Sequence, residues 1–248
     1  MNRPRVIPVL LLKERGLVKS IKFRDHRYIG DPLNTARIFN DLRADELILL
    51  DIDASRENRL IPLDFVDALA EEVTMPFSVG GGVRTLDDIR SLLAAGVEKV
   101  IIGTRAATDP AFIRQASEEF GSSTISVCID VKKSHFRRNR VAILGGKSLT
   151  SHDPVEYARL MESNGAGELI IQSVDRDGTM DGYDVELIKS VSTAVRIPVV
   201  ALGGAGDEND MAQAFNQGLA NAVAAGSLFV YHSKKRGVLV NYASPNFI

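Results

Sequence analysis

The 248-residue sequence contains a single cysteine, Cys128, and no tryptophan. One cysteine excludes an internal disulfide and suits a reducing compartment, so we expect a cytoplasmic protein. Long apolar runs are also missing. The run that follows the N-terminus covers residues 6–12 and ends at Lys13, which is too short for a membrane span, and no small-residue cleavage site follows it. The sequence therefore predicts no membrane segment and no membrane partner.

An excess of one charge is missing too. The formal net charge is −2, which provides no electrostatic reason to bind nucleic acid or an anionic surface. The four histidines are scattered, and no histidine–carboxylate cluster has the spacing of metal ligands. We therefore expect no metal and no cofactor. A hydrophobic fraction of 45% and a charged fraction of 25% are ordinary for a globular protein, and the length suits a single domain over residues 1–248.

The chain contains one pattern twice. Residues 76–82 read PFSVGGG, and 122 positions later residues 198–204 read PVVALGG. Residues 44–48 (ADELI) return at the same offset as residues 166–170 (AGELI). The offset is close to half of the chain length, which indicates that the two halves of the chain repeat one structural pattern.

Short apolar runs alternate with segments of helical periodicity along the chain. Most of the runs are almost continuously apolar, as expected for parallel strands covered on both faces. The predicted strands cover residues 6–12, 46–51, 77–79, 99–102, 124–130, 168–174, 199–202 and 222–225. Eight strand–helix units over this length predict an α/β fold, a parallel (β/α)8 TIM barrel built from two half-barrel repeats. A doubly wound sheet is the alternative, but the half-length repeat favours a closed barrel.

Residues that commonly begin helices stand between the predicted strands. Asp31, Asp109 and Asp153 each precede a proline and are expected to be N-caps. Thr85 is also an expected N-cap, because acidic residues follow it in the first turn.

Two longer stretches follow predicted strands. Residues 13–30 are rich in charge and predict a loop that contains Lys19. Residues 132–151 predict an irregular segment with a small hairpin at residues 140–144. Because active sites of such barrels lie at the carboxyl ends of the strands, we expect the second stretch at the active face.

Each repeat ends its strand in a glycine cluster that leads to a helix. Glycine lets backbone N–H groups approach an anion, and a helix N-terminus favours negative charge, so we predict one phosphate site at each cluster. The alternative is that the glycines only make tight turns. The predicted phosphate-binding residues are Gly81, Gly82, Thr104, Asp177, Gly178, Gly203, Gly204, Gly226, Ser227 and Lys19.

Carboxylates stand at the ends of several predicted strands. Asp51 and Asp53 end the second strand, Asp130 ends the fifth and Asp177 follows the sixth. Beside phosphate sites they indicate general acid–base chemistry on a phosphorylated metabolite. Asp130 is the strongest catalytic candidate, because it follows an apolar strand, and Asp177 is the second. A helix cap or a salt bridge is the alternative role for any one of them.

Several motifs together resemble one family. They are RVIP at residues 5–8, GDP at 30–32, ADEL at 44–47, VGGGVR at 79–84, DRDGT at 175–179, DGYD at 181–184 and GGAG at 203–206. They resemble the HisF-type cyclase subunit of imidazole glycerol phosphate synthase. The resemblance implies a (β/α)8 barrel that joins ammonia to a bisphosphorylated ribonucleotide intermediate and closes an imidazole ring. It also implies a heterodimer with a HisH-type glutaminase, which docks on the bottom face of the barrel and supplies the ammonia.

The same resemblance reveals departures at the top of the barrel. The family has two acid–base aspartates; Asp130 matches one of them, but Leu11 stands where the other is expected. Leucine can neither take nor give a proton, so we expect cyclase activity to be lost or weak. Gly103, Gln172 and Leu202 stand where the family usually has asparagine, threonine and serine.

The opposite end of the barrel keeps the family pattern. Strand alternation places four charged residues on inward faces at the N-terminal ends of strands, namely Arg5, Glu46, Lys99 and Glu168. Two positive and two negative charges neutralise each other, which makes their burial physically sensible. The resemblance implies that they form a gate through which ammonia enters the barrel. A simple plug of the barrel is the alternative.

Three functions remain open at this point. The first is a divergent subunit of a glutamine amidotransferase that passes ammonia to a sugar-amidating synthetase. Variants of this kind resemble proteins encoded with surface-polysaccharide (lipopolysaccharide) genes, where an acetamido sugar becomes an acetamidino sugar. The second is an active cyclase of histidine biosynthesis in which Glu14 or Asp177 replaces the missing carboxylate. The third is a scaffold that only activates its glutaminase.

Overall fold

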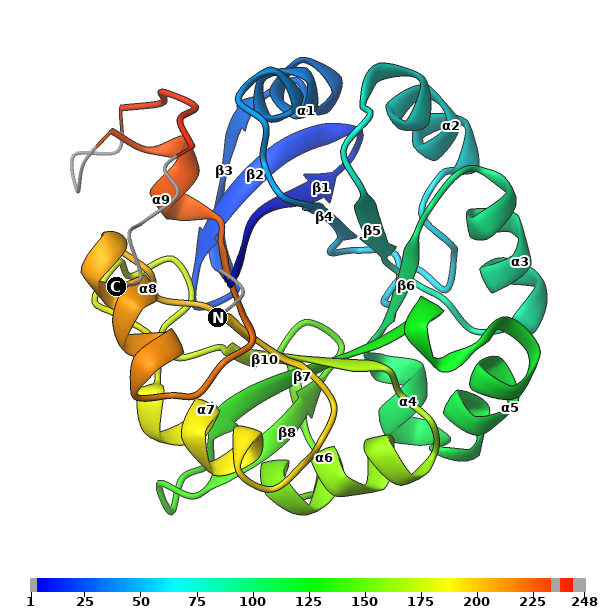
Figure 1. Ribbon diagram of the computed structural model, residues 1–248, viewed down its shortest axis with the longest axis vertical. Helices are drawn as coiled ribbons and strands as arrows, with labels where there is room; N and C mark the ends of the chain where they lie inside the picture. Colours follow the sequence, from blue (N-terminus) through cyan, green and yellow to red (C-terminus); the bar gives the residue numbers. More distant parts are fainter. Residues whose placement is uncertain (1–3, 233–236, 243–248) are drawn as a thin grey trace.

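The computed structural model describes residues 4–232 and 237–242. In this part of the chain, eight parallel strands close into a barrel that helices surround (Figure 1). Pairing of the last barrel strand with the first closes the sheet. In chain order the barrel strands are β1 (Arg5–Lys13), β4 (Leu47–Asp51), β5 (Phe77–Gly80), β6 (Lys99–Ile102), β7 (Ile125–Lys133), β10 (Glu168–Ser173), β11 (Val199–Leu202) and β12 (Ala222–Ala225). The predicted (β/α)8 barrel is confirmed.

The helices lie between the strands and pack on the outside of the barrel (Figure 1). They are α1 (Pro32–Asp41), α2 (Leu63–Glu72), α3 (Leu86–Ala94), α4 (Thr104–Thr108), α5 (Ala111–Phe120), the 3-10 turn η1 (Ser122–Thr124), α6 (Pro154–Ser163), α7 (Val185–Ser192), α8 (Glu208–Asn216) and α9 (Ser227–Val230). Asp31 and Asp153 accept backbone N–H groups at the starts of α1 and α6, and Thr85 forms a capping box at α3, as predicted.

Helix α5 begins differently from the prediction. Its N-cap residue is Pro110, so Asp109 lies one position too early to cap it. The Asp109 carboxylate instead accepts a hydrogen bond from Arg105 at 2.7 Å. The prediction of Asp109 as an N-cap is therefore wrong: the short helix α4 just before it supplies a cation that competes for the carboxylate.

Side chains alternate along each strand between the barrel axis and the helices. On β1, Ile7, Val9 and Leu11 belong to the inner apolar cluster, whereas Val6 and Leu10 pack in the outer layer against helices. Each fully buried aliphatic side chain stabilises the fold by about 1.5–3 kcal/mol. This alternation also places Arg5 and Leu11 on the inward face of β1, Arg5 at its start and Leu11 near its carboxyl end.

Two antiparallel extensions cover the carboxyl ends of the strands. β2 (Gly16–Ile21) and β3 (Arg24–Gly30) form a hairpin that pairs with β1, so residues 13–30 are not the loop predicted from their charge. Lys19 consequently lies in a strand. β8 (Asn139–Ile143) pairs with β7 and with β9 (Ser148–Leu149), close to the hairpin predicted at residues 140–144.

Two kinds of feature are missing from the part of the chain described above. None of its helices combines the length and the apolar character needed to cross a membrane. Within the same residues, no three histidine, cysteine, aspartate or glutamate side chains gather as a metal site would require.

Candidate functional site

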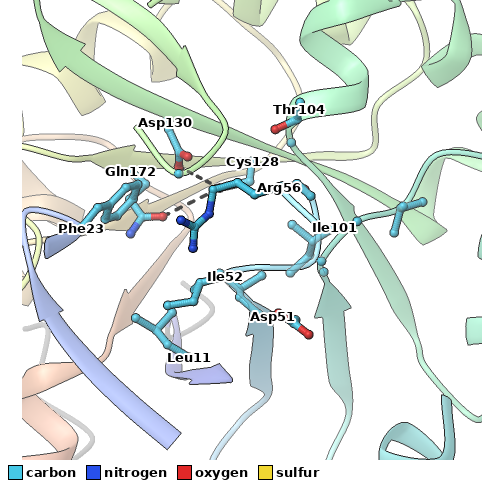
Figure 2. Close-up of a pocket in the computed structure, with 18 of the residues that line it drawn as sticks. Leu11, Phe23, Asp51, Ile52, Arg56, Ile101, Thr104, Cys128, Asp130 and Gln172 are labelled. Atoms are coloured by element: carbon cyan, nitrogen blue, oxygen red, sulfur yellow. Dashed lines mark hydrogen bonds between the residues drawn. The ribbon is translucent and has the colours of Figure 1, made fainter. Parts of the chain in front are cut away.

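A cavity of about 190 Å³ opens at the carboxyl ends of the barrel strands (Figure 2). Gly81, Gly82 and Thr104 line it, so three residues of the predicted phosphate set share one space. Asp130 and Leu11 line the same cavity. Since a single water needs about 10–15 Å³, there is room for an organic molecule rather than only a solvent molecule.

Asp130 lies on the inward face of β7 and points into this cavity (Figure 2). The Cys128 thiol, two residues earlier on the same face, donates to the Asp130 carboxyl group at 3.6 Å. Burial raises the pKa of Asp130 to about 7; the bond from Cys128 opposes this rise and the negative charge of Asp177 adds to it. Asp130 can therefore hold or release a proton near neutral pH, as a general acid–base residue must.

Leu11 contributes an apolar wall where a second carboxylate would stand. It is 8% exposed, and its register partners are Val18 on β2 and Leu50 on β4. Figure 2 places Leu11 beside Ile52, on the side of the cavity opposite Thr104. The cavity thus has a carboxyl group with a raised pKa on β7 and a leucine on β1. Its other lining carboxylate, Asp51 on β4, is paired with Arg59.

Asp51 ends the second barrel strand as predicted, whereas Asp53 lies two residues beyond its end; structural contacts hold both side chains. Asp51 pairs with Arg59 at 2.5 Å and accepts the backbone N–H groups of Asp53 and Ala54 at 3.1 Å. Asp53 pairs with Arg56. Both carboxylates therefore fix the loop after β4, which is the salt-bridge alternative considered from the sequence.

A second, smaller cavity of about 20 Å³ lies beside the first. Its wall contains Lys19, Asp177, Gly226 and Ser227 from the predicted phosphate set, together with Leu11, Gln172 and Leu202. The Lys19 ammonium group is buried and donates to the backbone oxygen of Val9 at 2.6 Å. Burial lowers the pKa of Lys19 to about 8, against the opposing effect of Asp177.

The other predicted glycines, Gly178, Gly203 and Gly204, line neither of these two cavities. A Cβ atom on Gly204 would lie 2.2 Å from the backbone oxygen of Gly182, and one on Gly178 would lie 1.9 Å from that of Ser20. Another segment of backbone approaches Gly178 and Gly204 so closely that only glycine fits at either position. Glycine is therefore required there whether or not a phosphate binds.

Four charged side chains meet at the other end of the barrel. Arg5 at the start of β1 pairs with both Glu46 and Glu168. Lys99 at the start of β6 lies 3.5 Å from Glu46 and 3.2 Å from Glu168. Each cation therefore bridges both carboxylates, and the four residues form a closed ring of opposite charges, which we call the basal ring.

Hydrogen bonds complete the basal ring. Ser78 donates to Glu46 at 2.7 Å, and Ser126 donates to Glu168 at 3.3 Å. Burial alone would lower the pKa of Arg5, but the carboxylates of Glu168 and Glu46 raise it above its usual value. The two glutamates are thus buried, charged and fully paired, which is the condition under which buried carboxylates are tolerated.

Known proteins match this chain along most of its length. A model of the histidine biosynthesis protein family matches residues 5–235. The imidazole glycerol phosphate synthase subunit HisF of Alkaliphilus metalliredigens is 43% identical over 94% of this chain and 92% of its own. The chain belongs to the HisF family. Two provisionally named members of that family, hisF2 of Pseudomonas aeruginosa and hisF3 of Vibrio vulnificus, are 44% and 41% identical, each over 99% of this chain and over 98% and 95% of their own.

Several residues of this HisF-family cavity have no signal in the sequence. Phe23 and His26 come from the β2–β3 hairpin, and Arg56 comes from the segment after β4, where it pairs with Asp53. Burial and the charges of Lys13 and Arg56 lower the pKa of His26. Only the hairpin brings Phe23 and His26 over the barrel, so a prediction that treats residues 13–30 as a loop does not find them.

Replacing Asp130 with asparagine is expected to change how stability depends on pH. The folded-state pKa of about 7 lies above the value of about 4 for an exposed aspartate. Between these values the unfolded chain releases the proton while the folded chain keeps it, so stability falls as the pH rises from about 4 to about 7. Asp130→Asn removes this fall. Because the open cavity screens the charge, we expect the variant to gain on the order of 2 kcal/mol over wild type between pH 4 and pH 8.

Urea unfolding of both proteins at the two pH values measures this gain. Carboxylates that do not interact with Asp130 are common to both proteins and cancel in the comparison. Asp177 interacts with Asp130, so the measured difference includes the coupling between these two carboxyl groups. An equal stability difference at pH 4 and pH 8 would contradict a raised pKa for Asp130.

Proposed function

We propose that this HisF-family chain is the barrel subunit of a glutamine-dependent complex. It receives ammonia from a HisH-type glutaminase bound at its bottom face and carries the ammonia along the barrel axis, while its own cyclase activity is lost or weak. One contrast supports this proposal. The basal ring of Arg5, Glu46, Lys99 and Glu168 is complete, whereas the top cavity has Leu11 in place of a carboxylate.

The barrel interior between these two ends suits a neutral molecule. Its inner cluster includes Ile7, Val9, Ile48, Ile101, Ile170 and Val200. An ammonium ion would lose its hydration on entering this apolar space, whereas uncharged ammonia has no such charge to desolvate. Leu11 extends the same apolar wall up to the top cavity. These features favour delivery of ammonia over its consumption at the top.

The proposed acceptor is a sugar bound to a third protein, a sugar-amidating synthetase that converts an acetamido group into an acetamidino group. The support for this acceptor is the resemblance of such Leu11-type variants to proteins of surface-polysaccharide biosynthesis. In this proposal all three proteins work in the cytoplasm, and the top face of the barrel is the side from which ammonia leaves.

A bacterial histidine auxotroph that lacks its cyclase tests the proposal. We expect no growth when this chain is expressed with a HisH-type glutaminase, and growth when the HisF of Alkaliphilus metalliredigens is expressed in the same way. Co-purification of the chain with a tagged glutaminase from the same cells shows that it is folded and bound. Growth at the rate of the control would overturn the proposed loss of cyclase activity.

An active cyclase of histidine biosynthesis is the second candidate, and the position of Asp177 favours it. Asp177 and Leu11 line the same small cavity, and burial raises the pKa of Asp177. Glu14 fits this role less well, because it is exposed in the turn between β1 and β2 and lines neither cavity. If the wild-type chain supports growth and Asp177→Asn abolishes it, Asp177 is the replacement carboxylate.

A scaffold that only activates its glutaminase is the third candidate. It shares the docking face with the first proposal but needs no passage of ammonia through the barrel. Substitutions in the basal ring separate the two, because they act on passage and leave the rest of the bottom face in place.

A further inference from the structure

The hairpin formed by β7 and β8 differs in charge from the rest of the chain. Residues 131–152 contain six lysines and arginines and no aspartate or glutamate, in a chain whose net charge is −2. The remaining residues therefore carry a net negative charge. Five of the six cations stand close together in the hairpin, namely Lys132, Lys133, Arg137, Arg138 and Arg140. We call residues 132–140 the basic hairpin.

The basic hairpin is an ordered extension of the barrel. Pairing of β7 with β8 continues for three residues beyond Asp130, which carries the hairpin about 10 Å past that carboxyl group. Backbone hydrogen bonds close its turn: the N–H of Ser134 donates to the oxygen of Arg138 at 2.8 Å, and the N–H of Arg137 donates to the oxygen of Ser134 at 2.9 Å. The two strands run side by side in Figure 1. The side chains of the turn are therefore presented on a fixed backbone.

The tip of the basic hairpin presents side chains that the described part of the chain leaves without partners. The Phe136 ring is 88% exposed. Among the described residues, the side chains of Lys133, Arg137 and Arg138 form neither a hydrogen bond nor an ion pair. Arginine and aromatic side chains contribute most of the binding energy at many protein interfaces, and an exposed phenylalanine gains free energy when a partner covers it.

The distribution of charge favours an acidic protein as the partner. A nucleic acid is held by a positive groove that follows several nucleotides, whereas the cations here are confined to one hairpin. A broad anionic membrane would also meet the negatively charged remainder of the chain. A protein surface can match a single hairpin, because the planar guanidinium group binds a carboxylate through two hydrogen bonds and a pocket can enclose one aromatic ring.

The basic hairpin adjoins the top cavity. β7 also carries Asp130, which lines that cavity, and Gly145 and Lys147 line it from the turn between β8 and β9. In the proposed function ammonia leaves the barrel by this face. A protein bound to the hairpin would therefore lie next to the place where the ammonia emerges.

We propose that the basic hairpin docks an acidic surface of the protein that accepts the ammonia. Arg137 and Arg138 pair with carboxylates of that surface, and Phe136 enters an apolar pocket within it. This inference rests on the proposed function and gives the acceptor protein a position on the barrel. Docking at the hairpin and passage of ammonia are separate properties, so either can fail without the other.

Calorimetric titration with the purified sugar-amidating synthetase of the same organism tests the proposal. The synthetase is titrated into the complex of the full chain with its glutaminase. We expect one synthetase to bind per chain. The dissociation constant should rise at least about tenfold when the salt concentration increases from about 0.05 M to about 0.3 M, because salt screens exposed charges.

Matched variants locate the docking surface. Arg138→Glu reverses one charge at the tip, and we expect the dissociation constant to rise at least about 30-fold, with a similar rise for Phe136→Ala. Arg114→Glu makes the same change of net charge at an exposed position of α5, and we expect the dissociation constant to stay within about twofold. Thermal unfolding of each variant shows whether the barrel is intact.

Two results would overturn the docking proposal. One is a folded wild-type complex that does not bind the synthetase; titration with single-stranded RNA and with phosphatidylserine vesicles then shows whether the hairpin takes another anion. The other is an equal loss of affinity in Arg138→Glu and Arg114→Glu.

The proposed function fails in a different way. Glutamine-dependent amidation of the sugar at an unchanged rate in Arg138→Glu would keep the proposed function and remove the docking site. Growth of the histidine auxotroph would overturn the loss of cyclase activity and leave the measured binding of the synthetase as it is.

Discussion

Replacing Leu11 with aspartate is expected to raise turnover of the bisphosphorylated ribonucleotide with ammonium salt by about 100-fold. A positioned acid or base contributes about 10²–10⁴ in rate, and the new carboxylate would share the top cavity with Asp130. We expect the lower end of that range, because Gly103, Gln172 and Leu202 still differ from the family pattern. The apolar neighbours Val18 and Leu50 would raise the pKa of the new carboxyl group. The rate should therefore have a bell-shaped pH dependence.

Leu11→Asn is the matched control for this experiment. Asparagine has nearly the size and polarity of aspartate but transfers no proton, so we expect it to leave the rate at the wild-type level. Both variants place a polar group in an apolar wall and should lose about 1–3 kcal/mol of stability, which urea unfolding measures. An equal gain from aspartate and asparagine, or no gain from a folded Leu11→Asp protein, would show that the missing carboxylate is not what limits cyclisation.

The barrel itself is predictable from the sequence because its strands are covered on both faces. The apolar runs at residues 99–102, 199–202 and 222–225 match β6, β11 and β12 residue for residue. Strand alternation likewise predicts that Arg5 and Leu11 share one face of β1, since side chains repeat every second residue. Such patterns determine where a side chain points, but not what it bonds to.

The top of the site is less predictable, because its walls come from segments without an apolar pattern. β3 is exposed along most of its length, so its polar sequence Arg24–Gly30 has no alternation to reveal a strand. Lys19 lies in the buried strand β2, and its bond to Val9 depends on a hairpin that the charge of residues 13–30 conceals. Arg56 enters the cavity from an irregular segment whose path depends on contacts with Asp53 and its neighbours.

Replacing Lys99 with methionine is expected to destabilise the barrel by about 3 kcal/mol. Lys99 is 15% exposed and lies within 3.5 Å of both Glu46 and Glu168, so its loss leaves two buried carboxylates with Arg5 alone. Removing one partner of a buried ion pair costs about 3–5 kcal/mol, and the remaining cation keeps the loss at the lower end. For a chain of this length the midpoint of thermal unfolding should fall by about 6–12 °C.

A second substitution that restores charge balance is the control for the basal ring. In a Glu168→Gln background the ring contains one carboxylate and two cations, so Lys99→Met should there cost much less than in the wild type. Equal losses in both backgrounds would show that Lys99 stabilises the barrel through packing and not through the ring.

The same Lys99→Met substitution tests whether ammonia passes through the barrel, provided that Leu11→Asp supplies a measurable cyclisation. In that background we expect glutamine-driven turnover with a HisH-type glutaminase to fall at least tenfold, and turnover with ammonium salt to change less than twofold, because free ammonia reaches the top cavity from solvent. Binding of the glutaminase, measured by calorimetry, should be unchanged. If glutamine-driven turnover persists, ammonia does not need the basal ring, and the chain acts as a scaffold for its glutaminase. If both nitrogen sources lose activity equally, the substitution has damaged the barrel and not a passage through it.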